Sequence, residues 1–565
     1  MSDRIWLKNY PAGIPADIDP DQFRSIPDLL EKTVAKFAAR PAFHNLGHTI
    51  SYAELAQLSR DFAAFLQGLP GMARGDRVAI MAPNLLQYPV ALFGVLRAGM
   101  TVVNVNPMYT PRELEHQLKD SGAKALVILE NFAHTLQQVR ASTPLRHVIT
   151  TQVGDLLPAR KRWLVNFVIK KVKKMVPAWH IDGAVKFRTA LARGRAGAFR
   201  PVDVTHDELA FLQYTGGTTG VSKGAMLTHR NILANLEQTG IWISGSFKEG
   251  AEIVIAPLPM YHIFCLTSTL SFMKWGSLTV LVTNPRDLPA LVKDLGKWKW
   301  SVMTGVNTLF NGLLNTPGFN DLDFSPLKVV IGGGAAVQKA VAERWKEVTG
   351  RAITEAYGLT ESSPGACGNP LGAPWNGTIG LPLPSTDLSI RDDAFNALPA
   401  WTGEGDIEKH TGEICIRGPQ VMTGYWNNPQ ETAKVLHDGW LKTGDLGHMD
   451  AGGCFTITDR KKDMVLVSGF NVYPNEIESV VAMHPGVLEC GVVGVPDDKS
   501  GEAVKVVVVR KDPNLTREAV VAHCREHLTG YKLPRHVEFR DALPKTPIGK
   551  VLRRELRDAA KPERP

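Results

Sequence analysis

The first half of the chain alternates short apolar runs with amphipathic segments. Residues 76–82, 101–105 and 123–129 are short runs rich in Val, Ile and Ala, which is typical of strands buried on both faces. Between them, residues 87–98 repeat apolar positions at helical spacing, and residues 111–119 form a second such segment opened by Thr110 and Pro111. The alternation recurs over residues 252–331. Strands that alternate with helices predict an α/β fold, here a large N-terminal domain of two doubly wound sheets.

The pattern changes twice in the second half of the chain. Turn signals at residues 403–406 and at Gly452-Gly453 separate short apolar segments, which favours an antiparallel, β-barrel-like region. After residue 463 the predicted order is strand 464–467, helix 474–483, strands 488–495 and 503–510, helix 516–528 and strand 537–539. This order predicts a small α+β domain. We therefore expect a domain boundary near residue 460, with an N-terminal domain over 1–459 and a separate C-terminal domain over 464–565.

Composition and cysteine usage narrow the class of protein. The 565 residues are 44% hydrophobic and 21% charged, which excludes a disordered chain. The six cysteines are scattered without a CxxC pair, so neither a disulfide framework nor a zinc site is predicted. The start lacks the apolar run of a secretory signal, and no stretch approaches the roughly 18 apolar residues of a spanning helix. These features predict a cytoplasmic protein.

The positive charge is concentrated in one segment. The chain has a formal net charge of +8, yet residues 156–200 hold twelve basic side chains and one acidic one, Asp182. Within the basic segment 160–176, apolar residues recur at helical spacing beside four lysines: Leu164, Val168, Val172, Met175 and Val176, with Lys170, Lys171, Lys173 and Lys174. Such a helix can lie on an anionic membrane surface, here the inner membrane, or can pack its stripe into a core. No nucleic-acid motif accompanies the charge, so no nucleic-acid partner is predicted.

A glycine-rich loop follows the apolar run at 209–214. It reads Tyr214-Thr-Gly-Gly-Thr-Thr-Gly-Val-Ser-Lys-Gly-Ala225. Glycines let the backbone approach phosphates, while the hydroxyl groups and the Lys223 ammonium attract them. A Walker A loop has Lys directly after Gly and a helix next, whereas here Ser222 intervenes and a second strand follows. The loop therefore predicts a nucleotide triphosphate cradle of another kind.

This loop resembles the phosphate loop of the acyl-adenylate-forming superfamily, which includes acyl-CoA synthetases, luciferases and peptide-synthetase adenylation domains. Further motifs resemble that family in the same order: residues 259–264, 332–335, 357–361, 442–445, 459–462 and 544–550. The stretches 83–94, 438–447 and 467–478 resemble bacterial long-chain fatty-acid–CoA ligases in particular. The resemblance covers essentially the whole chain, and it implies that residues 460–463 form a hinge and that the C-terminal domain over 464–565 is mobile. It implies a ligase of fatty acid metabolism that turns ATP, CoA and a long-chain fatty acid into acyl-CoA, AMP and diphosphate through an acyl-adenylate.

The resemblance also implies roles for particular residues. The catalytic set is Lys550, His262, Lys462, Thr218 and Glu361, of which Thr218 and Glu361 would bind Mg²⁺. The nucleotide would contact Tyr214, Thr215, Gly216, Gly217, Thr218, Thr219, Gly220, Lys223, Gly333, Gly334, Ala335, Tyr357, Gly358, Thr360, Asp445 and Arg460. The acyl pocket would contain His262, Phe264, Leu266, Val306 and Gly332, with Leu309, Phe310 and Ile331 as further wall residues. Gly469 would let the pantetheine arm of CoA pass.

Several alternatives stay open at this level. An aryl- or medium-chain acyl-CoA ligase would share the chemistry and differ in its pocket. A fatty acyl-AMP ligase would hand its product to a carrier protein, and a luciferase-like oxygenase would consume oxygen after adenylation. A non-catalytic nucleotide sensor or membrane scaffold would be expected to lack Lys550, Glu361 or the glycine loop, and all three are present. Assembly as a homodimer is a further open expectation.

Overall fold

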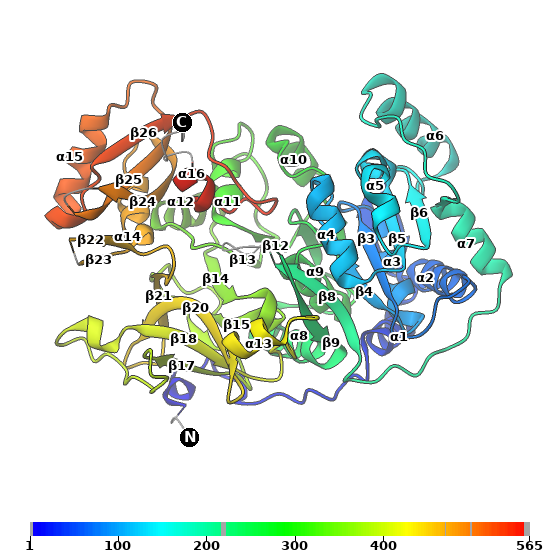
Figure 1. Ribbon diagram of the computed structural model, residues 1–565, viewed down its shortest axis with the longest axis horizontal. Coiled ribbons are helices and arrows are strands. Elements are labelled where there is room, and N and C mark those ends of the chain that lie inside the picture. The colour runs from blue at the N-terminus through cyan, green and yellow to red at the C-terminus, as the bar shows by residue number, and fades with distance from the viewer. Residues whose placement is uncertain (1–3, 216–221, 469, 498–499, 559–565) are drawn as a thin grey trace.

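The computed structural model describes residues 4–215, 222–468, 470–497 and 500–558. Figure 1 shows a large body that carries most of the chain and a small domain, drawn in orange and red, formed by its C-terminal end. The predicted glycine-loop residues Gly216, Gly217, Thr218, Thr219 and Gly220, and the predicted CoA-channel residue Gly469, lie outside the described residues.

Two mostly parallel sheets form the large domain, as the alternating pattern predicts. The seven-stranded sheet has the order β7-β6-β5-β3-β4-β8-β9, and only its β8–β9 pair is antiparallel among the described strands. Its strands are β3 (Arg77–Met81), β4 (Thr101–Asn104), β5 (Ala125–Leu129), β6 (His147–Thr151), β7 (Val185–Lys186), β8 (Leu209–Thr215) and β9 (Lys223–Thr228).

The second sheet has nine strands in the order β16-β15-β14-β13-β12-β10-β11-β1-β2. Its strands are β1 (Pro41–Asn45), β2 (His48–Ser51), β10 (Ile253–Ala256), β11 (Leu278–Leu281), β12 (Val302–Gly305), β13 (Val329–Gly332), β14 (Ile353–Gly358), β15 (Gly365–Gly368) and β16 (Leu381–Pro382). The central strands are parallel, so their carboxyl ends open on the same edge. Ligands bind at that edge in sheets of this type.

Helices cover both sheets and join them (Figure 1). They are α1 (Ile26–Phe37), α2 (Tyr52–Gln67), α3 (Gln87–Arg97), α4 (Pro111–Ser121), α5 (Ala133–Val139), α6 (Ala159–Phe167), α7 (Phe187–Ala196), α8 (His229–Ile243), α9 (Ile263–Lys274), α10 (Leu288–Leu295), α11 (Asn307–Leu314) and α12 (Lys339–Thr349). Every residue of α3 is buried. The Tyr88 hydroxyl of α3 bonds Asn104 of β4 at 2.5 Å and the carbonyl of Met260, which follows β10, at 3.1 Å. These bonds link the seven-stranded sheet to the nine-stranded sheet.

An antiparallel sheet follows, as the turn-rich pattern predicts. It contains β17 (Asp387–Arg391), β18 (Gly412–Arg417), β19 (Leu436–His437), β20 (Trp440–Met449) and β21 (Phe455–Arg460), with helix α13 (Pro429–Val435) beside it. The register of β20 against β21 pairs Asp445 with Arg460. This pairing brings two predicted site residues from distant motifs to the same point.

The small domain has a second five-stranded sheet. Its elements are β22 (Val465–Val467), β23 (Phe470–Val472), α14 (Pro474–Ala482), β24 (Val487–Asp497), β25 (Gly501–Arg510), α15 (Arg517–His527), β26 (His536–Arg540) and α16 (Arg553–Asp558). Valines of β24 and β25 face both sides of the sheet. Val492, Val506 and Val508 pack with α14 and α15, whereas Val493 and Val507 pack with Leu543 and Leu556. Both clusters consist of small-domain residues.

For the basic segment 160–176, the sequence left open whether its apolar stripe lies on a membrane surface or packs into a core. Helix α6 continues into a π-helical turn over Val168–Val172. Leu164, Val172 and Met175 of the stripe are exposed, and Val168 and Val176 are only half-buried. Trp163 is 67% exposed, and its ring stacks on that of Phe167 at a centroid distance of 5.3 Å. The interpretation that packs this stripe into a core is therefore wrong. In the described part of the chain, no helix has both the length and the apolar character needed to cross a bilayer.

Candidate functional site

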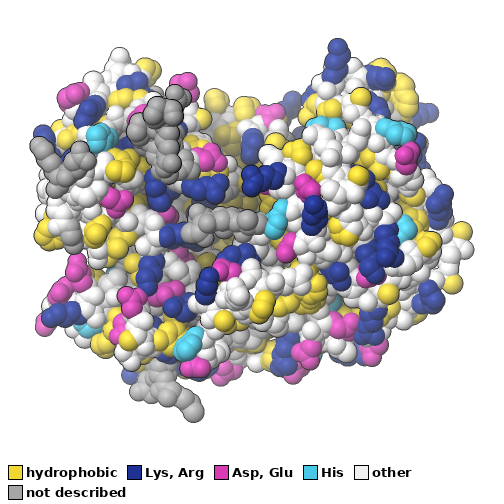
Figure 2. All heavy atoms as spheres, in the orientation of Figure 1, with side chains coloured by type: hydrophobic (Ala, Val, Ile, Leu, Met, Phe, Trp, Pro, Cys, Tyr) yellow, Lys and Arg dark blue, Asp and Glu magenta, His cyan; other side chains and the backbone are white. Residues whose placement is uncertain are grey.

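A cleft of about 2240 Å³ lies between the large domain, the antiparallel sheet and the small domain. Lys and Arg side chains gather around this hollow in Figure 2. Most of the predicted site residues line it: Tyr214, Thr215, Lys223, His262, Phe264, Val306, Gly333, Gly334, Ala335, Tyr357, Gly358, Thr360, Glu361, Asp445, Arg460, Lys462 and Lys550. Motifs separated by more than 300 residues therefore share one cavity.

One wall of the cleft carries a hydrogen-bonded triad. The Tyr357 hydroxyl donates to Asp445 Oδ2 at 2.6 Å, and Arg460 Nε lies 3.0 Å from Asp445 Oδ1. Asp445 is 3% exposed. Burial and the neighbouring carboxylate raise the pKa of Tyr357 well above its ordinary value, so its hydroxyl stays a donor. The triad places an aromatic ring beside a fixed carboxylate and a guanidinium, a suitable arrangement for a base and its sugar hydroxyls.

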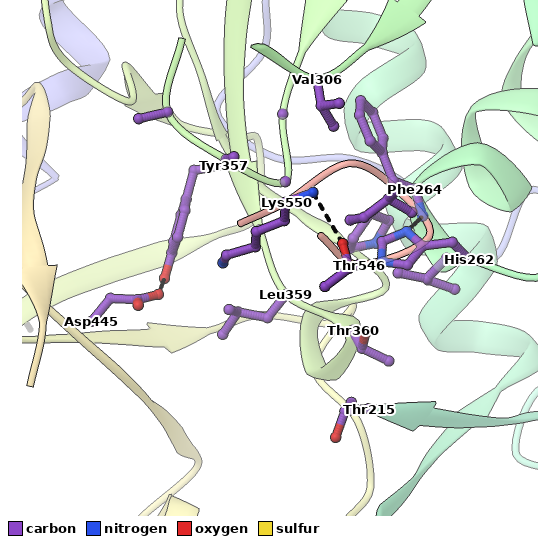
Figure 3. Close-up of a pocket in the computed structure, with 18 of the residues that line it drawn as sticks. Thr215, His262, Phe264, Val306, Tyr357, Leu359, Thr360, Asp445, Thr546 and Lys550 are labelled. Atoms are coloured by element: carbon purple, nitrogen blue, oxygen red, sulfur yellow. Dashed lines mark hydrogen bonds between the residues drawn. The ribbon is translucent and has the colours of Figure 1, made fainter. Parts of the chain in front are cut away.

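Lys550 enters the cleft on a loop of the small domain. Figure 3 shows its side chain between the Tyr357–Asp445 pair and the side formed by His262 and Phe264. The backbone N–H of Lys550 donates to Thr546 Oγ1 at 3.0 Å, which fixes the loop. Burial, followed by the nearby Arg460 cation, lowers the pKa of Lys550 to about 8.

The loop docks on the large domain through its glycine. The Thr308 hydroxyl donates to the carbonyl of Gly549 at 3.0 Å. Gly549 has a φ of +90°, and a Cβ built there would lie 2.5 Å from Thr308 Oγ1. Only glycine fits this close contact without a shift. On the facing side, two residues after β13, Gly334 has a φ of +75°, and a Cβ built there would lie 3.6 Å from Ile548 Cδ1.

His262 and Phe264 form the opposite wall, at the start of α9. The N–H of His262 bonds the Pro259 carbonyl at 3.0 Å, and Nδ1 of His262 accepts from the Phe264 N–H at 3.3 Å, capping the helix. Burial, with the Lys550 charge as a smaller cause, lowers the pKa of His262 to about 4. The ring is therefore neutral at physiological pH, and together with Val306 it gives this side of the cleft an apolar lining.

Three further predicted residues have partners inside the protein. The Tyr425 hydroxyl donates to Glu361 Oε1 at 2.7 Å and holds that carboxylate at the cleft. Lys223 forms an ion pair with Glu431 and lies 5.1 Å from the centroid of the Tyr425 ring. Tyr214 also lines the cleft, and its hydroxyl bonds Asp120 at 2.5 Å.

Four predicted acyl-pocket residues do not line the cleft, namely Leu266, Leu309, Phe310 and Gly332, whereas Ile331 does. Leu266 is fully buried because the turn of α9 directs it into the central core, away from Thr267 and Ser268, which do line the cleft. Phe310 is also fully buried, in the core beneath β12 and β13. A Cβ on Gly332 would meet Val337 and Ile353, so this glycine serves close packing at the strand end.

Comparison with known proteins places these motifs in a family. A family model described as AMP-binding enzyme matches residues 30–426, and one described as AMP-binding enzyme C-terminal domain matches residues 476–550. The chain belongs to the AMP-binding enzyme family. The cleft described above lies between the two matched regions of this AMP-binding enzyme.

Similar proteins span its whole length. A long-chain-fatty-acid–CoA ligase of Yersinia pestis is 55% identical over 98% of both chains. The crystal structure of ATP-bound MatB from Rhodopseudomonas palustris has a TM-score of 0.78 and 29% identity, covering 95% of this AMP-binding enzyme and 99% of that chain. That of the anthranilate CoA ligase AuaEII has a TM-score of 0.84 at 24% identity, covering 96% and 99%. The α/β fold with a smaller C-terminal domain is therefore that of solved relatives.

Sequence reasoning missed several residues that shape the cleft of this AMP-binding enzyme. Glu355, two positions before the Tyr357 motif, lines the cleft, and burial raises its pKa to about 7. Its position beside a recognised motif was a usable signal. Tyr425 and Thr308 lie in stretches without a motif, and only the fold brings them to Glu361 and Gly549.

Proposed function

We propose that the protein is a long-chain fatty-acid–CoA ligase. It first converts ATP and a long-chain fatty acid into an acyl-adenylate and diphosphate. The acyl-adenylate then reacts with CoA to give acyl-CoA and AMP. The full-length 55% identity with the Yersinia pestis ligase carries this proposal. The arrangement of Lys550 against Tyr357 and Asp445 in one cleft supports it.

In the first half-reaction a carboxylate oxygen attacks the α-phosphorus of ATP and diphosphate leaves. Tyr357 stacks on the adenine, and Asp445 with Arg460 holds the ribose. The Lys550 ammonium lies where negative charge gathers on the carboxylate and α-phosphate, and such preorganised charge lowers the barrier. The neutral His262 ring, Phe264 and Val306 face the acyl group. Removing the Lys550 charge is expected to slow adenylation by roughly 10²–10³-fold, as for other charge-stabilising donors.

Mg²⁺ is the cofactor that this chemistry requires. Glu361 presents a carboxylate at the cleft that Tyr425 orients, and hard oxygen ligands of this kind suit Mg²⁺. Thr218 is the second proposed ligand and lies outside the described residues. When bound, the ion would neutralise phosphate charge as diphosphate forms.

The second half-reaction needs a different face of the small domain. Rotation about Lys462 would withdraw the Lys550 loop and bring the backbone near Gly469 to the cleft, where glycine leaves room for the pantetheine arm. The CoA thiolate then attacks the acyl carbonyl, and AMP leaves. The domain boundaries 1–459 and 464–565 are part of this proposal.

Mass spectrometry of the products tests the function. Purified protein is incubated with ATP, Mg²⁺ and a panel of C6 to C20 acids plus benzoate, with and without CoA, and Lys550→Met serves as the control. We expect acyl-CoA to peak at long chains and to fall with Lys550→Met. A product peak on benzoate or short acids would refute the proposed long-chain substrate. Acyl-AMP that persists with CoA present would refute the proposed second half-reaction.

We also propose that the basic segment 160–176 binds the anionic surface of the inner membrane, where fatty acids partition. Its exposed apolar residues are Trp163, Leu164, Phe167, Val172 and Met175, each at least 45% exposed. Lys170, Lys171, Lys173 and Lys174 come shortly after the end of α6 in the sequence. Helix α6 lies at the edge of the large domain, on the side away from the small domain (Figure 1). Apolar insertion and attraction to anionic lipid act together in such segments.

Vesicle co-sedimentation tests this surface. Each lysine near an anionic surface contributes about 1 kcal/mol, so replacing Lys170, Lys171, Lys173 and Lys174 by Gln should weaken binding to phosphatidylglycerol vesicles more than about tenfold. A control variant with the exposed Lys297 and Lys339 changed to Gln should bind as the wild type does. Equal binding by all three proteins would refute the proposal.

A further inference from the structure

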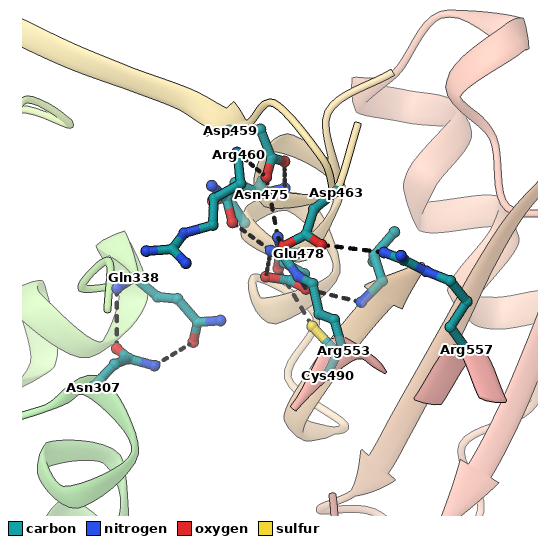
Figure 4. A network of polar contacts seen from close by, with 12 residues as sticks. Asn307, Gln338, Asp459, Arg460, Asp463, Asn475, Glu478, Cys490, Arg553 and Arg557 are labelled. Carbon is teal, nitrogen blue, oxygen red and sulfur yellow. Dashed lines mark hydrogen bonds and ion pairs between the residues drawn. The ribbon is translucent and has the colours of Figure 1, made fainter. Parts of the chain in front are cut away.

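The carboxylate of Asp459 lies at the junction of the two domains. Asp459 is fully buried near the end of β21, three residues before Lys462. Both of its oxygens accept hydrogen bonds from the small domain: Arg553 Nη1 donates to Oδ1 at 3.0 Å, and the Asn475 backbone N–H donates to Oδ2 at 2.9 Å. Figure 4 shows this carboxylate at one end of a polar network centred on Arg553.

The other partners of Arg553 move with the small domain. Its Nε and Nη2 donate to the two oxygens of Glu478 at 3.1 and 2.7 Å, and Asp463 Oδ2 lies 3.6 Å from Nη1. Burial on its own lowers the pKa of Arg553, but the carboxylates of Glu478 and Asp459 outweigh it and raise the pKa above its ordinary value. Glu478 and Asp463 follow Lys462 in the chain, so a rotation there leaves them paired with Arg553 and separates only Asp459.

The other hydrogen bonds between the described parts of the two domains are weaker in kind. The Thr308 hydroxyl bonds the Gly549 carbonyl, and Asn311 Nδ2 bonds the Leu488 carbonyl at 2.8 Å, both without formal charge. Among the described residues before 460 and after 463, Asp459 and Arg553 form the ion pair that joins the two domains. Separating a buried ion pair leaves a buried charge without its partner, which is strongly unfavourable.

Arg553 is also close to the reactive loop along the chain. Three positions separate it from Lys550, and the loop between them is short and ordered by the Lys545–Val551 bridge. A bond that fixes Arg553 against the large domain therefore fixes where Lys550 enters the cleft. Asp459 does not line the cleft, and Arg553 acts here through the position of Lys550, so both are positioning residues.

We propose that Asp459 and Arg553 form a latch that holds the small domain in the adenylate-forming orientation and opens before the CoA-dependent step. The latch rests on the proposed function, because it assigns each half-reaction to one orientation of the small domain. It predicts that weakening this one pair slows the first half-reaction without slowing the second.

Matched substitutions on either side of the hinge test the latch. Asp459→Asn is compared with Asp463→Asn, which alters another partner of Arg553 but lies beyond Lys462. Palmitate-dependent diphosphate release should fall about tenfold with Asp459→Asn, within the usual range of coupling between sites. CoA thioester formation from supplied palmitoyl-AMP should be as fast as in the wild type or faster. Asp463→Asn should leave both rates within about threefold of the wild type.

Arg553→Lys provides a second route if Asp459→Asn does not fold. It keeps a positive charge for Glu478 but loses the forked geometry that reaches Asp459. We expect the same split between the two half-reactions, and we expect the double variant to be no slower than either single variant. Equal slowing of both half-reactions by Asp459→Asn or Arg553→Lys, or the same split with Asp463→Asn, would overturn the latch.

A cross-linking measurement reads the orientation without any substrate. Asn311→Cys and Leu488→Cys, at two partly exposed positions, are introduced together in a Cys454→Ser background, because the other native cysteines are buried. A short bismaleimide should join them readily in the wild-type background and about tenfold more slowly with Asp459→Asn. An unchanged rate would overturn the latch. Failure of the wild type to make palmitoyl-CoA would instead overturn the proposed function, and the two failures are thus distinguishable.

Discussion

The rate constant kcat/KM for adenylation should fall as the pH rises through about 8, because Lys550 loses its charge there. Burial, together with the Arg460 cation, lowers the pKa of its ammonium to about 8 in the ligand-free protein. The second-order rate constant kcat/KM reports ionisations of the free enzyme. Only the protonated lysine supplies positive charge, so kcat/KM for ATP should be highest below pH 8 and should fall as the pH rises through it.

The size of the fall follows from this pKa. At pH 9, one unit above a pKa of about 8, about one tenth of the lysines keep their charge, so kcat/KM should drop about tenfold for each further pH unit. Bound phosphates favour the ammonium form, which raises its pKa. The falling limb of kcat should therefore lie at higher pH than that of kcat/KM.

Diphosphate release without CoA is the suitable assay, because a free thiol itself titrates near this pH. Lys550→Arg is the matched control, since a guanidinium stays protonated up to about pH 12. This variant should be slower than the wild type but should have a flat kcat/KM from pH 7 to 10. A wild-type profile that stays flat to pH 10 would refute the reasoning, as would a variant that keeps the wild-type falling limb.

Three further predictions concern the hinge, the metal site and the packing beneath the nucleotide. Lys462→Pro should keep diphosphate release but lose thioester formation from supplied acyl-AMP by more than about tenfold, because the hinge can no longer change its φ angle; equal loss of both rates would contradict this. Glu361→Gln keeps an oxygen for the neighbouring phenol but loses the charge, so the Mg²⁺ concentration for half-maximal diphosphate release should rise about tenfold, and an unchanged Mg²⁺ titration would argue against the site. Gly358→Ala would place a Cβ 1.8 Å from the Pro364 carbonyl oxygen, so its unfolding free energy in urea should fall by about 1–3 kcal/mol, whereas Gly530→Ala, which enters open space, should change it little.

Many of the elements could be predicted from the sequence because they have a local cause. The expected helix at 111–119 is α4, whose first turn is fixed by a capping box between Thr110 and Glu113. In the small domain the expected strands 488–495 and 503–510 are β24 and β25, each two or three residues longer. Strand β23 was not predicted because it is a three-residue edge strand with a polar centre.

The contacts of the site could be predicted only in part. Resemblance to a family assigned Asp445 and Arg460 to the ribose, and the register of two strands brings them together. No local pattern links Asp459 to Arg553, 94 positions later, or Lys223 to Glu431, 208 positions later. Such pairs depend on how whole domains pack. The basic segment was ambiguous for a related reason, because periodicity shows that a helix has an apolar face but not what covers it.

The small domain has a hydrophobic core of its own. Valines of β24 and β25 fill two clusters, one on each side of the sheet, and both are closed by residues of the same domain. The segment after the hinge therefore has the internal cohesion of an autonomous folding unit. Cleavage of the chain in the hinge should release a small domain that stays folded. Exchange of the small domain between relatives should also preserve its folding, provided that Arg553, which bonds Asp459, is kept.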